Sequence, residues 1–187
     1  MGIILFVISW MLFNCFLAAI AVVSGWLMLL SRSRKIMYIF LLIWLLFIPN
    51  TVYLLTDVAH LFEDWNTVAF YFKPILILLY AALIIVSIIS FIAAIYPFEL
   101  LLKLSKNVKK NYFAVLVLLN FGIGFAIVLG RVKRVSSWEV ITNIPKVSHD
   151  IFNVLATSEL LLLAIGLGVI VNGIYFCTKN LVKLRGR

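Results

Sequence analysis

Charged residues are scarce in this chain of 187 residues. Only 12% of the residues are Asp, Glu, Lys or Arg, whereas 65% are hydrophobic, and the mean hydropathy is +1.19. Globular domains are typically about half apolar, so this composition excludes an ordinary soluble domain. A bilayer can solvate such side chains, and backbone groups in lipid must hydrogen-bond internally. The apolar segments should therefore be helices.

Cysteine is also rare, since the chain has only Cys15 and Cys177, both in or at the edge of apolar stretches. This placement argues against a disulfide framework and against a zinc site built on cysteines. A basic segment is missing before the first apolar stretch, and that stretch is too long for a signal peptide. We expect it to be retained as a membrane span.

Five apolar stretches are each long enough to cross a hydrocarbon core, which requires about 20 residues. They cover residues 3–30, 36–55, 74–96, 112–130 and 157–178. The sequence therefore predicts an all-α fold, a polytopic transmembrane helical bundle of about five spans with an amphipathic or re-entrant outer helix. No soluble domain interrupts the spans, so we expect a single integral membrane domain over residues 1–187.

The basic residues occur in short clusters that follow the first, third and fifth predicted spans. Eleven of the sixteen lie there: Arg32, Arg34, Lys35, Lys103, Lys106, Lys109, Lys110, Lys179, Lys183, Arg185 and Arg187. Such clusters are typical of membrane topology rather than of a nucleic-acid-binding face. The positive-inside tendency predicts an outer N-terminus and a cytoplasmic C-terminus, with the lipid bilayer and no nucleic acid as partner.

The acidic residues follow the opposite distribution. Six of the seven lie at or near the predicted outer side, together with both histidines: Asp57, Glu63, Asp64, Glu139, Asp150, Glu159, His60 and His149. Only Glu99 is on the predicted inner side. Because acidic residues have little influence on topology, this asymmetry requires another explanation. We infer an outward-facing polar site.

The segment PNTVYLLTDVAHLFEDW, residues 49–65, is the first candidate for that site. Proline is tolerated in the first turn of a helix, so we expect a helix to begin, or to restart after a kink, at Pro49. At about 100° per residue, five polar residues then share one face. They are Asn50, Tyr53, Asp57, His60 and Asp64. Such a helix lies at the outer interface or re-enters the protein.

The spacing of Asp57, His60 and Asp64 suits more than one kind of chemistry. Imidazole and carboxylates can ligate a divalent metal ion, and the same groups can act as general acid and base. An interfacial helix whose polar stripe meets water also explains the pattern. No stronger motif, such as H-E-x-x-H, accompanies these residues, so all three interpretations remain open.

The second outer connection contains GRVKRVSSWE, residues 130–139. Ser136 and Glu139 fit the S-x-x-E pattern of a capping box, which predicts a short helix at this point. We expect Ser148 to cap the last long helix and Asp150 to lie in its first turn.

Arg131 and Arg134 in the same connection are spaced to face one way. They can pair with Asp57, Glu63 or Asp64 of the first connection, or they can hold a lipid phosphate. The first interpretation places the two outer connections next to each other, and the second places the arginines next to a lipid headgroup.

Small residues and amides stand out within the fourth and fifth predicted spans. They are Asn120, Gly122 and Gly124 in the fourth and Gly166, Gly168, Asn172 and Gly173 in the fifth. Small residues allow helices to approach closely, and an Asn can hydrogen-bond across the contact, so we expect these spans to pack together. Glu159 precedes a long apolar run, and below the interface its carboxylate would have to face protein or a cavity.

The two outer segments resemble the bacterial family called domain of unknown function 1361, and the resemblance covers nearly the whole chain. It is carried by Pro49, Asn50, Tyr53, Thr56, Asp57, His60, Leu61, Gly130, Arg131, Arg134, Ser137 and Trp138. Ser136 stands where the family pattern often has Asn. The resemblance implies a small integral protein of the bacterial cytoplasmic membrane and brings no established activity. It also implies that the two outer segments belong together.

The sequence thus predicts one outward-facing site made by the two segments. Its candidate residues are Asn50, Tyr53, Thr56, Asp57, His60, Asp64, Arg131, Arg134 and Trp138, and the metal ligands, if any, are Asp57, His60 and Asp64. The first functional hypothesis is binding, or help in transport, of a small solute or ion. Five spans are few for a self-sufficient transporter, so a homo-oligomer or other membrane subunits are the expected partners.

Two other functions are consistent with the same residues. One is an envelope enzyme acting on a lipid-linked phosphate, in which Asp57 and His60 serve as acid and base or as ligands of a divalent metal. In that enzyme Arg131 and Arg134 hold the phosphate. The other is a structural or regulatory subunit of a membrane complex. The sequence does not distinguish catalysis from binding.

Overall fold

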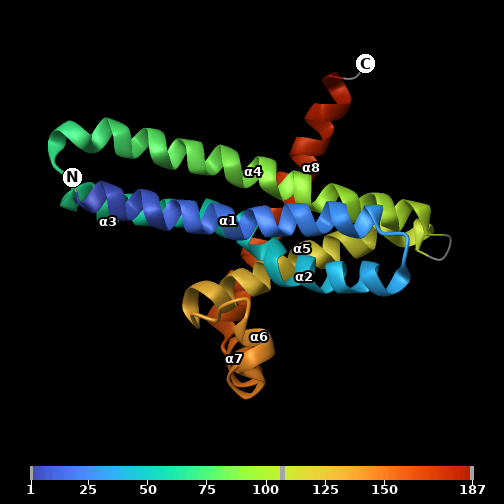
Figure 1. Cartoon of the computed structure of the whole chain (residues 1–187). Helices are drawn as coiled ribbons and strands as arrows, with labels where there is room; N and C mark the ends of the chain where they lie inside the picture. Colours follow the sequence, from blue (N-terminus) through green and yellow to red (C-terminus); the bar gives the residue numbers. More distant parts are fainter. Residues whose placement is uncertain (1, 106–107, 186–187) are drawn as a thin grey trace. The chain divides into compact units, whose positions relative to one another are not determined.

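The structure is a computed structural model that describes residues 2–105 and 108–185. Throughout these ranges the regular structure is helical, with no strand (Figure 1). The chain divides into two compact units, Met1–Ile95 and Tyr96–Arg187, and the boundary falls inside one long helix. Each unit is described separately below.

The first unit is built on three long helices. Its elements are α1 (Gly2–Leu30), α2 (Arg34–Thr56), the 3-10 turn η1 (Asp57–Ala59), α3 (His60–Thr67), the 3-10 turn η2 (Phe70–Phe72) and the first part of α4 (Lys73–Leu104). Helices α1 and α2 make the most extensive contact in this unit. Its core includes Val7, Met11 and Ala18 of α1, Leu54 of α2, and Leu76, Tyr80 and Leu83 of α4.

The second unit contains the end of α4 and the remaining elements. These are the 3-10 turn η3 (Lys109–Asn111), α5 (Tyr112–Val132), α6 (Glu139–Thr142), α7 (Ile144–Ala156) and α8 (Ser158–Arg185). Helices α5 and α8 form its main contact, and α7 packs against both of them. Val128, Val154 and Ala164 meet in the small core that joins these three helices.

Five helical segments are long and apolar enough to cross a membrane. They are Leu5–Leu30, Arg34–Thr67, Phe70–Leu104, Lys109–Val132 and Ser158–Lys179. Helix α7, in contrast, has 13 residues. At about 1.5 Å per residue it is too short to cross a core of about 30 Å. The prediction of an all-α, multi-pass membrane fold with about five spans is confirmed.

The prediction that a helix begins or restarts at Pro49 is wrong, because α2 continues through Pro49 to Thr56. Proline removes one backbone N–H from a helix and its ring crowds the preceding turn. Side chains next to Pro49 bond to carbonyl groups of that turn: Asn50 Nδ2 donates to Phe47 O (3.2 Å) and Thr51 Oγ1 donates to Ile48 O (2.7 Å). The α-helix changes to a 3-10 turn only at Asp57.

Tertiary contacts also hold α2 on both sides of Pro49. Trp44 Nε1 donates to Ala94 O of α4 (2.8 Å), and Ser87 Oγ of α4 donates to Thr51 O (2.7 Å). The Trp44 indole is completely buried beside Gly25 of α1, where a Cβ atom would lie 3.0 Å from the ring. This packing gives a physical reason for the helix to continue past a residue that would otherwise end it.

The expected packing of the fourth and fifth spans is confirmed in the second unit. Asn120 Nδ2 of α5 donates to Asn172 Oδ1 of α8 (3.0 Å), and Asn172 Nδ2 donates to Gly168 O within α8 (2.9 Å). A Cβ atom added to Gly124 would lie 2.8 Å from Ala164 O, and one on Gly168 would collide with Phe121. The two helices therefore approach through glycine positions and are joined by an amide pair.

The second outer connection differs in detail from the expectation. The capping pattern is formed in part, because Ser136 N donates to Glu139 Oε2 (2.6 Å) just before α6. Ser148 and Asp150 lie inside α7, not at the start of the last long helix. Asn143 caps α7 instead, since its Oδ1 accepts from Lys146 N (3.3 Å). Asparagine and serine are equally good N-cap residues, so Asn143, five residues before Ser148, can cap the helix.

Glu159 lies in the first turn of α8 and is exposed. A carboxylate at a helix N-terminus interacts favourably with the helix dipole, which gives this residue a local structural role.

Gly124→Ala should destabilise the protein, because the added methyl group meets backbone atoms of α8 that cannot rotate away. We expect a loss of about 1–3 kcal/mol in the free energy of unfolding, the usual cost of overpacking. Gly122→Ala is the matched control two residues away, where a Cβ atom has no neighbour within 4 Å. Unfolding in detergent measures both variants, and equal stability of the two would contradict the close contact.

Candidate functional site

The first unit contains a group of polar residues near the junction of α2 and α3. Asp57 is the most buried, with 0% of its surface exposed, although it is ionisable and lies in a candidate membrane span. Asn14 Nδ2 of α1 donates to Asp57 Oδ2 (3.0 Å). The end of α2 and the 3-10 turn that follows it thus bring a carboxylate onto the apolar contact between α1 and α2.

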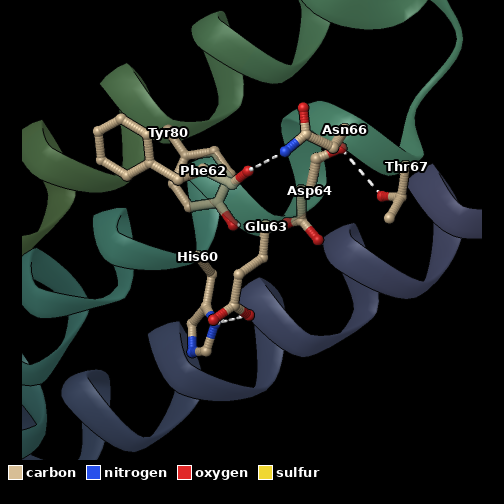
Figure 2. Close-up of polar contacts among 7 residues, drawn as sticks. All are labelled: His60, Phe62, Glu63, Asp64, Asn66, Thr67 and Tyr80. Atoms are coloured by element: carbon tan, nitrogen blue, oxygen red, sulfur yellow. Dashed lines mark hydrogen bonds and ion pairs between the residues drawn. The ribbon is translucent and has the colours of Figure 1, made fainter.

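His60 begins α3 and is paired within its own helix. Its Nδ1 lies 3.0 Å from Glu63 Oε2, and Figure 2 shows the two side chains turned towards each other. The imidazole also meets the edge of the Trp10 indole of α1, with ring centroids 5.4 Å apart and planes at 89°. The side chain of Glu63 is 77% exposed and that of His60 38% exposed, so this pair reaches the surface.

Asp64 is joined to α4. Tyr80 OH donates to Asp64 Oδ2 (2.7 Å), as Figure 2 shows, and the Tyr80 side chain is almost fully buried in the core of the unit. Thr67 Oγ1 donates to the backbone oxygen of Asp64 (2.9 Å) and closes the end of α3. Tyr80 was not identified from the sequence, because a single tyrosine in a long apolar run has no motif that marks it.

The metal site expected from Asp57, His60 and Asp64 is not assembled. Within the described ranges, no group of three or more His, Cys, Asp and Glu side chains is arranged to hold a metal ion. Asp57 and Asp64 are seven residues apart, which corresponds to about 10 Å along a helix axis. Each has a nearer hydrogen-bond donor on another helix, and His60 bonds to Glu63. Residues on one helix face therefore do not converge on one ion here.

Two other candidates in this segment, Asn50 and Thr56, bond to nearby backbone. Asn50 Nδ2 donates to Phe47 O, and Thr56 Oγ1 donates to Tyr53 O (2.8 Å). Tyr53 and Thr56 are half-buried near the end of α2. These bonds give Asn50 and Thr56 a role in holding the last turns of the helix that positions Asp57.

The candidates of the second segment lie in the second unit. Arg131 is in the last turn of α5, Arg134 has a left-handed backbone conformation (φ 53°), and Trp138 is half exposed before α6. Val135 N donates to Leu129 O (3.1 Å) and closes the end of α5 around Arg134. A site shared by the two outer segments stays a prediction.

Glu139 of the second segment has two partners. Lys146 Nζ lies 2.5 Å from its Oε1, and Ser136 N donates to its Oε2. The hydrogen bond from Lys146, followed by that from Ser136, lowers the pKa of Glu139 below the usual glutamate value. The pair joins α6 to the start of α7.

A second polar cluster, in the second unit, centres on Glu99. This carboxylate is buried, with 4% exposed, and it accepts from Tyr175 OH and Lys179 Nζ of α8 and from Lys103 Nζ of α4 (2.6 Å). The sequence analysis gave Glu99 no role. The signal that could have revealed it is the spacing, because Glu99 with Lys103 and Tyr175 with Lys179 are both separated by four residues.

A family model described as "Protein of unknown function (DUF1361)" matches residues 13–174. The chain belongs to the DUF1361 family. No curated protein and no solved structure matches it. The resemblance found in the sequence is therefore confirmed.

Both outer segments and most of the buried polar contacts fall within the region that the DUF1361 model matches. Asn14, Asp57, Tyr80 and Glu99 are inside it, whereas Tyr175 and Lys179 lie just beyond its end. The family description states no activity, so the chemistry of these contacts has to carry the functional argument.

Asn14→Leu should destabilise the first unit, because it removes the amide donor from a buried carboxylate. We expect a loss of about 1–3 kcal/mol, the cost of leaving a buried polar group without its partner. The double variant Asn14→Leu/Asp57→Leu should recover part of that loss. Unfolding in detergent of the two single variants and the double variant gives the coupling energy, and strictly additive losses would contradict the contact.

The Glu139–Lys146 pair should respond to pH. Because the folded-state pKa of Glu139 is lowered, its contribution to stability is present above the usual glutamate pKa and is lost as pH falls through the lowered value. We expect the NMR amide signal of Ser136 to titrate with a midpoint below that of an ordinary glutamate. Lys146→Met should move the midpoint upwards, and an unchanged midpoint would contradict the assignment.

Proposed function

We propose that this DUF1361 protein binds a small monovalent cation, a proton or an alkali ion, at Asp57 and assists its movement through the membrane. The observation that carries the proposal is the complete burial of Asp57 in a candidate membrane span. An ionisable side chain inside a span is costly, and such residues commonly mark ion or proton pathways.

The charge of the segment that carries Asp57 favours a cation. The stretch from residue 57 to residue 73 contains the carboxylates of Asp57, Glu63 and Asp64 and one basic residue, Lys73. Lys73 Nζ lies 4.7 Å from the centre of the Trp65 ring, a cation–π contact. Three negative charges against one positive charge leave this stretch with a surplus of two negative charges when the histidine is neutral.

The three carboxylates of this stretch range from exposed to completely buried. Glu63 is at the surface, Asp64 is half-buried against Tyr80, and Asp57 is completely buried. Negative groups at increasing depth lower the energy of a cation that leaves water for the apolar interior. The carboxylate of Asp57 provides oxygen atoms, the ligand type that hard cations prefer.

The donor set favours a monovalent ion over a transition metal. His60 bonds to Glu63 and packs against the edge of the Trp10 ring. No cluster of three ligating side chains occurs in the described part of the chain. The outward direction of the site rests on the distribution of basic residues and belongs to this proposal, as does assembly into a homo-oligomer or with other membrane subunits.

Flux measurements in proteoliposomes test the proposal. The wild-type protein should conduct protons, Na⁺ or K⁺ under a gradient of each ion in turn. Asp57→Asn, which keeps the size and hydrogen-bonding shape of the side chain, should reduce the flux at least tenfold. Glu159→Gln is the control, because it removes an exposed carboxylate at the start of α8. No flux from the wild-type protein, or equal flux from the wild-type and Asp57→Asn proteins, would refute transport through Asp57.

A second candidate function is an envelope enzyme that acts on a lipid-linked phosphate. It is favoured by Arg131 and Arg134 at the end of α5, because arginine binds phosphate in a bidentate manner and Arg134 is held in an unusual backbone conformation. Loss of retained polyprenyl phosphate in the Arg131→Ala/Arg134→Ala variant would favour this candidate. Wild-type behaviour of that variant and of Asp57→Asn would leave a structural subunit as the explanation.

A further inference from the structure

We propose that Lys103 and Lys179, held by Glu99, form a binding site for a phosphate group, such as the headgroup of an anionic phospholipid. This site is independent of the cation site proposed above. Its residues come from the end of α4, from α8 and from the start of α5, all in the second unit.

Two lysines share one carboxylate in this cluster. Lys103 Nζ and Lys179 Nζ both contact Glu99 Oε1, whereas Tyr175 OH donates to Glu99 Oε2. Lys179 Nζ also donates to Tyr175 OH (3.2 Å). The single negative charge is therefore already satisfied by three donors, and the cluster keeps a net charge of +1.

Among the described residues of the unit, Glu99 is the carboxylate with which Lys103 and Lys179 are paired. The remaining acids of the unit are Glu139, Asp150 and Glu159. Glu139 is paired with Lys146, and Glu159 is at the opposite end of α8 from Tyr175. The 16 helical steps between Glu159 and Tyr175 correspond to about 24 Å. A charge near hydrocarbon is costly without a counter-ion, so an external anion would stabilise this end of the unit.

The lysines are positioned to accept such an anion. The side chain of Lys103 is 40% exposed and that of Lys179 is 22% exposed, so both are accessible while part of each is shielded from water. An ammonium group has three N–H donors, and the contacts above use one on Lys103 and two on Lys179. The free donors suit the several oxygens of a phosphate, for which lysine acts as a point charge.

The Tyr112 ring adds a fixed wall to the site. Lys103 Nζ lies 5.4 Å and Lys179 Nζ lies 5.8 Å from its ring centre, both within cation–π range. Tyr112 begins α5 directly after η3, which contains Lys109 and Lys110, so further positive charge is close in sequence. Basic pockets between membrane helices are a common form of headgroup site, particularly on the cytoplasmic side predicted for this end.

Binding of lipid to the purified full-length protein, followed by native mass spectrometry, tests the site. The wild-type protein should bind phosphatidylglycerol about tenfold more tightly than phosphatidylcholine, as expected for two lysines at a lipid headgroup. Lys103→Gln and Lys179→Gln should abolish that preference. Lys146→Gln is the matched control, because Lys146 is also 40% exposed and paired with a glutamate, and it should keep the preference.

A second arm separates a lipid headgroup from a soluble phosphate. If the natural occupant is soluble, 10 mM inorganic phosphate should raise the thermal stability of the wild-type protein but not that of Lys179→Gln, while the two lipids bind equally. Either pattern supports a phosphate site and identifies its source. If the wild-type protein shows no preference for phosphatidylglycerol and no stabilisation by phosphate, the proposal fails. It also fails if Lys146→Gln has the same effect as Lys103→Gln and Lys179→Gln.

Glu99→Gln distinguishes an anion site from a purely structural ion pair. Removing the carboxylate raises the net charge of the cluster from +1 to +2, so binding of phosphatidylglycerol should increase several-fold in the variant that remains folded. Unfolding temperatures without lipid check the fold of each variant. A folded Glu99→Gln protein with weaker binding would contradict this charge dependence, and the proposal would fail.

Discussion

The structure depends on one constraint, which is that a polar group inside a membrane helix must find its partner within the protein. The contacts of both units follow from it. The Trp44 indole bonds to a backbone carbonyl of α4, Asn120 bonds to Asn172, and the buried carboxylates of Asp57 and Glu99 each take donors from another helix. Among the described residues, Asn120 Oδ1 and Asp150 Oδ2 are buried oxygens without a hydrogen-bond partner. Apolar side chains on the surface of the spans need no hydrogen-bond partner, because lipid can solvate them.

The two polar clusters have opposite charge and different construction. The segment 57–73, which carries Asp57, contains more carboxylates than basic residues, and its members bond separately to α1, α3 and α4. The cluster around Glu99 has a surplus of lysines that converge on one oxygen. A surplus of negative charge favours a cation, and a surplus of positive charge favours an anion. The two proposals therefore require different ligands, and each can fail without the other.

The sequence predicts the membrane fold well because hydropathy is a local property. Apolar length is sufficient to find all five spans, and Gly124, Gly168 and the asparagines are sufficient to predict which helices pack in the second unit. Contacts between residues far apart in the chain are harder to predict from the sequence. Nothing in the sequence around Asp57 points to Asn14, 43 residues away, and the four-residue spacing of Glu99 and Lys103 does not by itself identify Tyr175, 76 residues away, as their partner. The helix through Pro49 was missed for the same reason, because contacts from α4 support it.

The amide pair between α5 and α8 has a consequence for how the second unit assembles. Helices that insert into a bilayer one by one can slide and rotate before they associate, since lipid is as apolar as their side chains. A shift of one helical turn, about 5.4 Å, would separate Asn120 from Asn172 and would also move Gly124 away from Ala164 and Gly168. Only one alignment satisfies the amides and the glycines together. The amide pair and the glycines together thus fix the register in which α5 and α8 pack.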